Sequence, residues 1–528
     1  MLNKKCNADE IENLINSAKS GEICKLENKE YYLSRRVVIK NKENIIIDGQ
    51  GSKIITKYVN YDDFTKSTDA FLIEDSKAVT LKNFVFDTDV PTNITAVIED
   101  IYELNETESA VIIKVDDCYN INGNEVLMAF DSADSDGSFD YKFHKYSLHK
   151  NNKNIVTYMQ DEIIVFNTYA GLKNDYLGDN RFKLYMLTKE ITKATVGIRF
   201  CVRHTMYGSS VITVRNSDDT VIKDITMHST PGMGIIVLAR SNNMVVDGLK
   251  IIKAEGSHTL MAGNCDGIHL AGLTGKFVMK NCVYDGLGDD ALNVHATAGT
   301  ITGIDLDNKT LKVNYCKKFE DGVLPKRWCQ KGDEIRVFNP ENLEHIATFT
   351  VEEFEDERLK FSDLKGKLEK GFMIQNAVFT PACEVDNCVM RNTRARGLLF
   401  QTENVEVKNC EIYGISSSGI LAAPAFEQWY EVGPVHNMYI HNNKFIKCGF
   451  VNGKEAVFVG SNHNSADIKV WHLHSNIRVE DNVFEDCPGT QISIAATDGV
   501  AIKSNVFKNR QNDENNIKTQ NCTEVEIN

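Results

Sequence analysis

One short motif recurs along most of this chain and limits its fold more than any other feature. Apolar and polar residues alternate for a few positions, an Asn or Asp follows, and further apolar residues close the unit. Copies occur at residues 78–86, 220–227, 244–251, 277–284, 383–390, 405–412, 438–445, 477–484 and 500–507. Later copies start 22 to 24 residues apart, or 33 to 39 where a loop is longer, which is the period of a solenoid.

Each copy predicts a β-strand, because it alternates with a period of two, carries β-branched and aromatic residues, and ends in a turn residue. One period holds about three short strands and their corners, and parallel stacking pairs each strand with the next turn. We therefore predict an all-β fold, a right-handed parallel β-helix. Asparagines expected at its corners, where Asn tolerates the left-handed backbone region, are Asn83, Asn281, Asn387, Asn409 and Asn443.

The ends and interruptions of the repeat define the domains. Residues 7–21 predict an amphipathic capping helix, with Asn7 and Glu10 as a capping pair and Gly21 as its stop. Its apolar face comprises Ile11, Leu14, Ile15 and Ala18. The repeat is lost twice, and irregular strand-like segments there predict two inserted small β-barrels or sandwiches. The expected division is 1–92 (cap and first turns), 93–205 (first insertion), 206–299 (β-helix with the acidic motifs), 300–378 (second insertion) and 379–528 (last turns).

Composition excludes several classes of protein. With 42% apolar and 25% charged residues the chain is typical of a folded protein, and 528 residues need either several cores or a repeated one. The net charge of −15 argues against a nucleic-acid partner and, more weakly, against a polyanionic substrate. The fourteen cysteines are too dilute for a disulfide scaffold. Several recur at one repeat position, as Cys282, Cys388 and Cys410 do, so we expect reduced core residues.

No other sequence signal indicates a metal, a cofactor or a membrane. Clustered Cys and His spacings typical of zinc sites are absent, and we expect no metal and no cofactor. The N-terminal residues contain no long apolar stretch, so we expect neither a secretory signal nor a membrane anchor, and a cytoplasmic location. Whether the protein forms a homo-oligomer stays open.

The stretch 263–295, GNCDGIHLAGLTGKFVMKNCVYDGLGDDALNVH, carries the chemistry. Asp266 precedes Asp289 by 23 residues and Asp290 by 24, which is one turn of the solenoid. Adjacent parallel strands lie about 4.8 Å apart, so the three carboxylates should form one cluster. Like charges this close raise at least one pKa, and a protonated carboxyl beside ionised ones is what glycoside hydrolysis needs. A calcium site or solvated corner residues are the alternatives.

These residues resemble known families. CDGIHL followed by GDD is similar to the NTDG and GDD motifs of the polygalacturonases, glycoside hydrolase family 28, which are inverting β-helix enzymes. The Gly-His-Gly and Arg-Ile-Lys motifs of that family are missing. The fuller resemblance is to the α-1,3-galactosidases of family 110. They too have a β-helix interrupted by β-barrels, with an Asp one turn before a Gly-Asp-Asp that Asn and His follow, here Asn293 and His295.

This resemblance implies an inverting exo-α-galactosidase acting on an oligosaccharide or glycan with terminal α-galactose. Asp266, Asp289 and Asp290 would supply its acid and base, with Asp289 or Asp290 as the general acid. Inverting enzymes separate the working carboxyl groups by about 6.5 to 9.5 Å, so we expect the productive pair to be splayed beyond one rung.

Candidate substrate-binding residues surround these aspartates. His269 and His295 alternate with them toward one face, where they contact substrate or satisfy corner partners. Arg394 and Arg396 fall in the next turn and either grip sugar hydroxyls and carboxylates or simply point outward. In the loop 425–433, Trp429 with Glu427 or Glu431 suits a sugar pocket, although a loop Trp is also an ordinary packing residue. The full predicted set is His269, Asn293, His295, Arg394, Arg396, Glu427 and Trp429.

Two other classes of function stay open. An endo-hydrolase or lyase on an acidic polysaccharide would want a basic groove, which the net charge disfavours. A non-catalytic carbohydrate-binding β-helix is compatible with every motif, because motifs alone do not prove turnover. The segment WHLHS, 471–475, is interpreted as a loop and not as a metal site.

Overall fold

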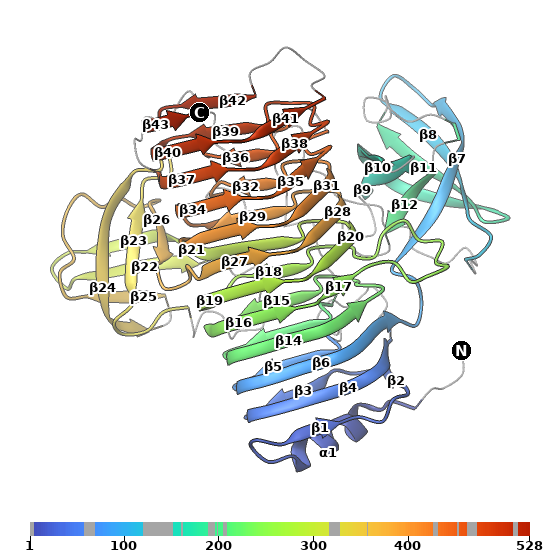
Figure 1. The fold of residues 1–528 in the computed structure, drawn as a ribbon, viewed down its shortest axis with the longest axis horizontal. Coiled ribbons are helices and arrows are strands. Elements are labelled where there is room, and N and C mark those ends of the chain that lie inside the picture. Colours follow the sequence, from blue (N-terminus) through green and yellow to red (C-terminus); the bar gives the residue numbers. More distant parts are fainter. Residues whose placement is uncertain are drawn as a thin grey trace.

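The computed structural model describes most of the chain as a stack of parallel strands (Figure 1). The described residues are 5–57, 69–119, 152–159, 162–187, 196–197, 199–203, 209–315, 328–355, 357–425, 431–450, 453–461, 473–509 and 516–528. Their strands wind as a parallel β-helix in which each turn pairs with the next, as the repeat predicts.

Three columns of strands form the walls of the β-helix. The first column contains β1 (Ile23–Lys25), β4 (Glu43–Thr56), β6 (Lys77–Thr88), β14 (Asp218–Met227), β16 (Ser241–Asp247), β19 (Leu273–Lys280), β27 (Ala382–Asp386), β30 (Val405–Lys408), β34 (His436–His441), β37 (His474–Glu480), β40 (Thr497–Lys503) and β43 (Thr523–Ile527). The second contains β2 (Glu30–Leu33), the distal halves of β4, β6 and β14, then β17 (Lys250–Ile251), β20 (Val283–Leu287), β28 (Val389–Thr393), β31 (Glu411–Ile415), β35 (Lys444–Ile446), β38 (Val483–Glu485) and β41 (Val506–Lys508). The third contains β3 (Val37–Lys40), β5 (Phe71–Glu74), β13 (Ile212–Arg215), β15 (Ile235–Leu238), β18 (Ile268–Leu270), β21 (Leu292–Asp305), β29 (Leu398–Gln401), β32 (Ile420–Ala422), β36 (Val457–Val459), β39 (Ile492–Ala495) and β42 (Ile517–Gln520).

One continuous apolar core runs along the inside of these columns. Side chains stack on their counterparts in the next turn: the rings of Phe445 and Phe484 are 4.8 Å apart between centroids, and those of Phe484 and Phe507 are 5.4 Å apart. The repeat-position cysteines, which are free and buried as predicted, are Cys282, Cys388 and Cys410. Each repeat therefore adds one layer to the core along the helix axis, while the cross-section of the β-helix stays the same.

Asparagines form the corners, with one change from the prediction. Asn281, Asn387 and Asn409 all have a positive φ, and the side chain of Asn387 donates a hydrogen bond to that of Asn281. Asn443 was expected at such a corner, but the left-handed residue is its neighbour Asn442. Asn443 is instead buried, and it donates hydrogen bonds inside the stack. Sequence pattern alone does not tell which of two consecutive asparagines turns inward.

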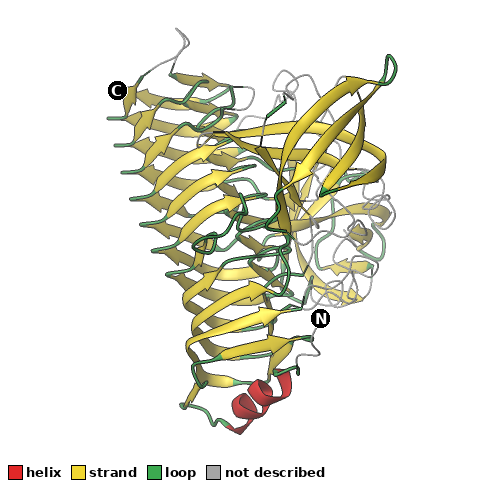
Figure 2. Cartoon of the chain, turned by 90° about the vertical axis from the view of Figure 1, so that its right-hand side faces the viewer, coloured by secondary structure: helices red, strands yellow, loops and turns green. Residues whose placement is uncertain are grey.

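The helix α1 (Ala8–Ser17) lies at the N-terminal end of the stack, where Figure 2 shows it below the first strands. It buries Ala8, Ile11 and Ile15 against the core, whereas Leu14 is 38% exposed. The predicted side-chain cap is wrong in detail, because Asn7 makes no such bond to the helix backbone. Its side chain accepts a hydrogen bond from the Tyr32 backbone and donates one to Glu10. Asn7 therefore ties the helix to the first turn. Among the described residues no helix has the length and apolarity to cross a membrane.

Two groups of antiparallel strands project from the β-helix on opposite sides in Figure 1. One is a closed barrel of β7 (Asn93–Glu103), β8 (Glu108–Val115), β9 (Asn152–Met159), β10 (Glu162–Gly178), β11 (Arg181–Leu187) and β12 (Arg199–Arg203). The other joins the far end of β21 to β22 (Thr310–Tyr315), β23 (Glu334–Phe338), β24 (His345–Glu355), β25 (Arg358–Phe361) and β26 (Met373–Asn376). They fall within the two stretches where the repeat is lost.

The second group of strands is anchored to the β-helix by buried polar contacts. Arg240, two residues after the end of β15, donates two hydrogen bonds to the carboxylate of Asp333, which is 3% exposed. Asn376 donates to the same carboxylate at 2.8 Å. β21 itself pairs in parallel with β18 and β29 through residues 292–295 and in antiparallel with β22 and β26 through residues 298–305. One strand therefore belongs to both units.

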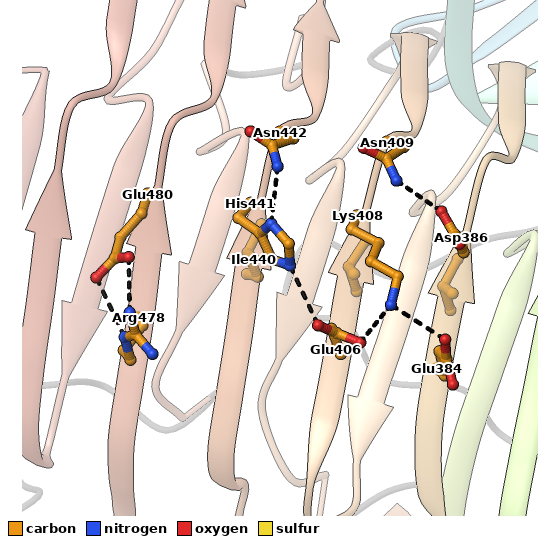
Figure 3. Close-up of polar contacts among 12 residues, drawn as sticks. Glu384, Asp386, Glu406, Lys408, Asn409, Ile440, His441, Asn442, Arg478 and Glu480 are labelled. Carbon is orange, nitrogen blue, oxygen red and sulfur yellow. Dashed lines mark hydrogen bonds and ion pairs between the residues drawn. The ribbon is translucent and has the colours of Figure 1, made fainter.

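A charge ladder lies on part of the outside of the first column, and Figure 3 shows its members from Glu384 to His441. We use this name for Lys276, Glu384, Glu406, Lys408 and His441, which lie on four successive turns. The Lys408 ammonium lies 3.1 Å from Glu384 and 2.6 Å from Glu406. These side chains are 15% to 56% exposed, so the ladder is a solvated surface feature.

Candidate active site

The register of the third column stacks the acidic motifs on a basic residue. Ile268 pairs with Leu292, and Leu292 pairs with Leu398. The residues two positions before each of them, Asp266, Asp290 and Arg396, therefore occupy equivalent places on three successive turns. The one-turn spacing predicted from the sequence is confirmed.

Asp290 is the most deeply buried member of the site, with no exposed surface. Its carboxylate accepts a hydrogen bond from the Arg396 backbone N–H at 2.9 Å and another from the Arg396 guanidinium at 2.6 Å. Burial raises the pKa of Asp290, and the charges of Asp289 and Asp266 raise it further, while Arg396 opposes both effects. Arg396 thus offsets part of the free-energy cost of a negative charge at this buried position.

Asp289 and Arg394 lie beside this column, and Asp289 keeps more contact with solvent than Asp266 or Asp290 does. The side chain of Asp289 is 16% exposed and that of Arg394 is 13% exposed, with 3.7 Å between carboxylate and guanidinium. Arg394 also donates to the Gly288 carbonyl, which fixes the turn that carries the aspartates. Of the three aspartates, Asp289 is the one with the largest exposed surface.

Asp266 begins a chain of buried hydrogen bonds. One of its oxygens accepts from the Asp290 backbone N–H at 3.0 Å, and the other lies 2.6 Å from Nδ1 of His269. Nε2 of His269 lies 2.9 Å from Nε2 of His295, whose Nδ1 is 3.0 Å from the Ala296 carbonyl. Burial raises the pKa of Asp266 well above its usual value and lowers the pKa of both histidines, that of His295 to about 4.

Glu431 is brought in by a strand that the repeat does not predict. β33 (Glu431–Val432) pairs in antiparallel with β21, so that Glu431 lies opposite Thr297. Its carboxylate is 3.7 Å from Nε2 of His295 and 3.5 Å from the side-chain nitrogen of Asn293. In the sequence Glu431 is one of two acidic residues beside Trp429, the other being Glu427, and this proximity was the available signal.

The other predicted residues divide into three groups. His269, Asn293, His295, Arg394 and Arg396 all lie beside the aspartates. Glu427 and Trp429 lie outside the described residues. In WHLHS, residues 471–472 are also outside them, and the loop interpretation is wrong for residues 474–475, because β37 begins at His474. The buried His474 ring bonds to two backbone groups, the Val435 N–H and the Gly460 carbonyl.

The geometry brings two sets of ionisable groups within 4.8 Å, one of Asp266, Asp289 and Asp290 and one of His269, His295 and Glu431. Either set has the spacing to share a cation, and the first also has the spacing to share a proton. Each of the three aspartates places one carboxylate oxygen within 4.8 Å of the others, whereas inverting enzymes separate the two working carboxyl groups by about 6.5 to 9.5 Å.

Comparison with known proteins gives this site a context. The family described as the right handed beta helix region matches residues 359–528, which confirms the predicted handedness of the fold. An α-1,3-galactosidase B of Bacteroides thetaiotaomicron is 27% identical over 320 residues, covering 59% of this chain and 51% of the relative. An α-1,3-galactosidase A of Shewanella woodyi is 23% identical over 495 residues, covering 88% and 73%.

The chain is similar to α-1,3-galactosidases. The resemblance inferred from the acidic motifs is therefore confirmed by similarity over 56% to 88% of this chain. An α-1,3-galactosidase A of Bacteroides fragilis is 28% identical over 304 residues, covering 56% of this chain and 49% of the relative. The chain spans about half the length of the first curated relatives that it matches.

Two solved structures that align with this chain have TM-scores below 0.5. A family 28 exopolygalacturonase of Yersinia enterocolitica has a TM-score of 0.45 at 10% identity, covering 99% of this chain and 76% of its own. A mannuronan C-5 epimerase A-module of Azotobacter vinelandii has a TM-score of 0.42 at 12% identity, covering 99% and 96%.

Proposed function

We propose that this protein is an exo-acting glycoside hydrolase that removes terminal α-linked galactose, as its α-1,3-galactosidase relatives are named for doing. The observation that carries the proposal is the column of Asp266, Asp290 and Arg396, with Asp289 at its open side. Three carboxylates this close repel one another, so at least one of them holds a proton near neutral pH. Hydrolysis of a glycoside uses both a protonated and an ionised carboxyl group.

Exposure suggests how the roles divide. Asp289 keeps the largest exposed surface of the three aspartates, so we assign it the contact with the glycosidic oxygen, to which it would pass the proton that the three carboxylates share. Asp290 is held by two hydrogen bonds from Arg396, which oppose the rise that burial causes in its pKa. It would orient the attacking water or the base that activates it. Glu431 and Asn293 offer acceptors and donors for sugar hydroxyls.

Inversion of the anomeric centre is part of the proposal and rests on the family resemblance. The close spacing of the aspartate oxygens does not support it by itself. Proton NMR of the first product formed from a nitrophenyl α-galactoside tests it directly. Initial release of β-galactose is the expected result, and initial release of the α-anomer contradicts inversion.

A substrate panel tests the rest of the proposal. Aryl α- and β-glycosides should be offered together with defined galactosides of different linkage and with oligogalacturonate. We expect release of galactose from α-1,3-linked termini and no cleavage of the acidic polymer. Both arginines beside the aspartates face carboxylates of the site itself, so they are poorly placed to bind an acidic polymer. Cleavage of oligogalacturonate alone would overturn the proposal.

A further inference from the structure

We propose that His269 and His295 are positioning residues that keep Asp266 protonated in the resting protein. They do so through a chain of hydrogen bonds that has only one consistent direction when both rings are neutral. The inference deepens the proposed function and depends on it only for the use of this proton in hydrolysis.

The direction of the chain is set at its far end. A carbonyl oxygen can only accept a hydrogen bond, so Nδ1 of His295, 3.0 Å from the Ala296 carbonyl, must carry a hydrogen. A neutral imidazole has one N–H, and Nε2 of His295 is then an acceptor. Ala296 lies where β21 passes from the β-helix into the second group of strands, a rigid place for such an anchor.

The next two bonds follow from the first. Nε2 of His269 lies 2.9 Å from Nε2 of His295, so His269 must donate its hydrogen there. Nδ1 of His269 is then the acceptor in the 2.6 Å contact with Asp266. An acceptor nitrogen requires a donor opposite it, and the carboxyl of Asp266 can donate only when it is protonated.

A second contact agrees with this assignment. The other oxygen of Asp266 accepts from the Asp290 backbone N–H at 3.0 Å. Asp266 thus uses one oxygen as an acceptor and the other as a donor, which is the pattern of a neutral carboxyl group or of an amide. An ionised carboxylate would instead accept at both oxygens.

One other arrangement contains the same number of protons. In it His295 is an imidazolium and Asp266 a carboxylate, with the hydrogen bonds reversed. Burial opposes it, because the side chains of His295, His269 and Asp266 are 2%, 5% and 6% exposed and two charges would have to form there. Glu431 would favour the imidazolium but stands 3.7 Å away, outside hydrogen-bond distance.

The charges around Asp266 also favour its neutral form. The charged and titratable groups that face it or its immediate neighbours are Asp289, Asp290, Glu431, Arg394, Arg396, His269 and His295. With Asp266 neutral, the aspartates Asp289 and Asp290 face the two guanidinium groups of Arg394 and Arg396, and these charges balance. A third carboxylate at Asp266 would have no cation of its own.

Nitrogen-15 NMR of the histidine rings tests the inference without any turnover. In protein labelled at histidine, we expect the Nδ1–H form for His295 and the Nε2–H form for His269. His474 is an internal reference, because a backbone N–H donates to its Nδ1 and its Nε2 donates to a carbonyl, which fixes the Nε2–H form. An Nδ1–H form of His269, or an imidazolium at either ring, would overturn the inference.

Two matched variants test the direction of the chain. His295→Gln keeps an accepting oxygen near the position of Nε2, whereas His295→Asn places its amide near Nδ1 and leaves His269 without an acceptor. We expect His269 to keep its Nε2–H form in His295→Gln and to lose it in His295→Asn. The same form in both variants would show that the chain does not hold the proton.

Asp266→Asn and a metal measurement complete the test. An Asn side chain reproduces the donor and acceptor of a protonated Asp, so this variant should keep both histidine forms. Reversal of the His269 form would contradict a protonated Asp266. Elemental analysis of the purified protein is the second control. A stoichiometric divalent metal on His269, His295 and Glu431 would also overturn the inference, since both Nε2 atoms would then be bare.

Activity provides a readout that a purely structural role would not move. If α-galactoside hydrolysis is found, the alkaline limb of kcat/KM should shift to lower pH by about one unit in His295→Asn, because Nδ1–H of His269 then stabilises the Asp266 carboxylate. His295→Gln should restore it. Absence of hydrolysis would sink the proposed function and leave the NMR result intact.

Discussion

Two regions of this molecule place charged side chains on successive turns at the same spacing, with opposite outcomes. On the outer face of the first column, Lys408 bridges Glu384 and Glu406 in solvent (Figure 3). In the third column, Asp266 and Asp290 stack on a single arginine, with both aspartates almost completely buried. The rung spacing is common to both, so it does not decide which cluster carries chemistry.

Water and the supply of cations decide it. Hydrogen bonds from Lys276 and Lys408 lower the pKa of Glu384 and of Glu406, respectively, so the charge ladder stays ionised. We use the name inner cluster for Asp266, Asp289 and Asp290 with Arg396. Burial raises the pKa of Asp266 and Asp290, so the inner cluster retains protons. The same strand spacing thus gives an ionised surface cluster on the first column and a buried cluster that retains protons on the third.

The largest expected effect is on catalysis at the inner cluster. Asp289→Asn should lower kcat/KM on a nitrophenyl α-galactoside by about 1,000-fold, because a general acid contributes about 100- to 10,000-fold. Asn has nearly the shape of Asp, and the Asp289 side chain is only partly buried, so the melting temperature should stay nearly unchanged. Asp386→Asn, on the outer face beside Asn409, is the matched control and should keep full activity. Equal activity in the two variants would remove Asp289 from the mechanism.

Removal of Arg396, the cation beside Asp290, should lower the free energy of unfolding. Arg396→Met leaves the Asp290 carboxylate buried without its partner, and we expect about 3 kcal/mol less free energy of unfolding at alkaline pH. The loss should shrink at acidic pH, where Asp290 binds a proton and needs no cation. Urea denaturation at two pH values measures both, and a loss that is independent of pH would contradict this account.

The two clusters should respond to pH with opposite signs. The raised pKa of Asp266 means that the folded state binds more protons than the unfolded state above about pH 4, so this group destabilises the fold as pH rises. The lowered pKa of Glu406 means that its contribution is present above about pH 4.5 and is lost as pH falls. Relative to the parent, the melting temperature of Asp266→Asn should rise as the pH increases from about 5 to about 8. The melting temperature of Glu406→Gln should lie below that of the parent throughout this range. Parallel pH profiles of the two variants would refute the comparison.

The smallest effect is expected at the ladder cation. Lys408→Met removes contacts to two exposed carboxylates, and exposed pairs contribute about 0 to 1 kcal/mol each. Urea unfolding should therefore show a loss of less than about 1 kcal/mol, which added salt reduces further. A loss as large as that of Arg396→Met would mean that exposure does not separate the two clusters.

Sequence reasoning was strongest where a single period determines the structure. The spacing from Asp266 to Asp290 predicted their stacking, because strand register in a solenoid repeats with the sequence. It was weaker for choices within one turn, such as Asn442 against Asn443 at the corner. Those depend on which side chain finds space inside, which a pattern of polar residues does not contain.

The same limit applies to the site. Arg396 was a candidate because it falls in the next turn, and its bond to Asp290 follows the register. The contact between His269 and His295 was not predicted, since it depends on ring orientations and not on strand spacing. Glu431 arrives on an antiparallel strand outside the repeat, so no periodicity pointed to it.

The strand shared by two units has a consequence for engineering. β21 carries His295 and Ala296 in its first half and continues without a break into the second group of strands. Replacing that group with a short connecting turn would end the strand where the Ala296 carbonyl is held. The second insertion is therefore not an exchangeable module, and a minimal version of this protein would have to keep it.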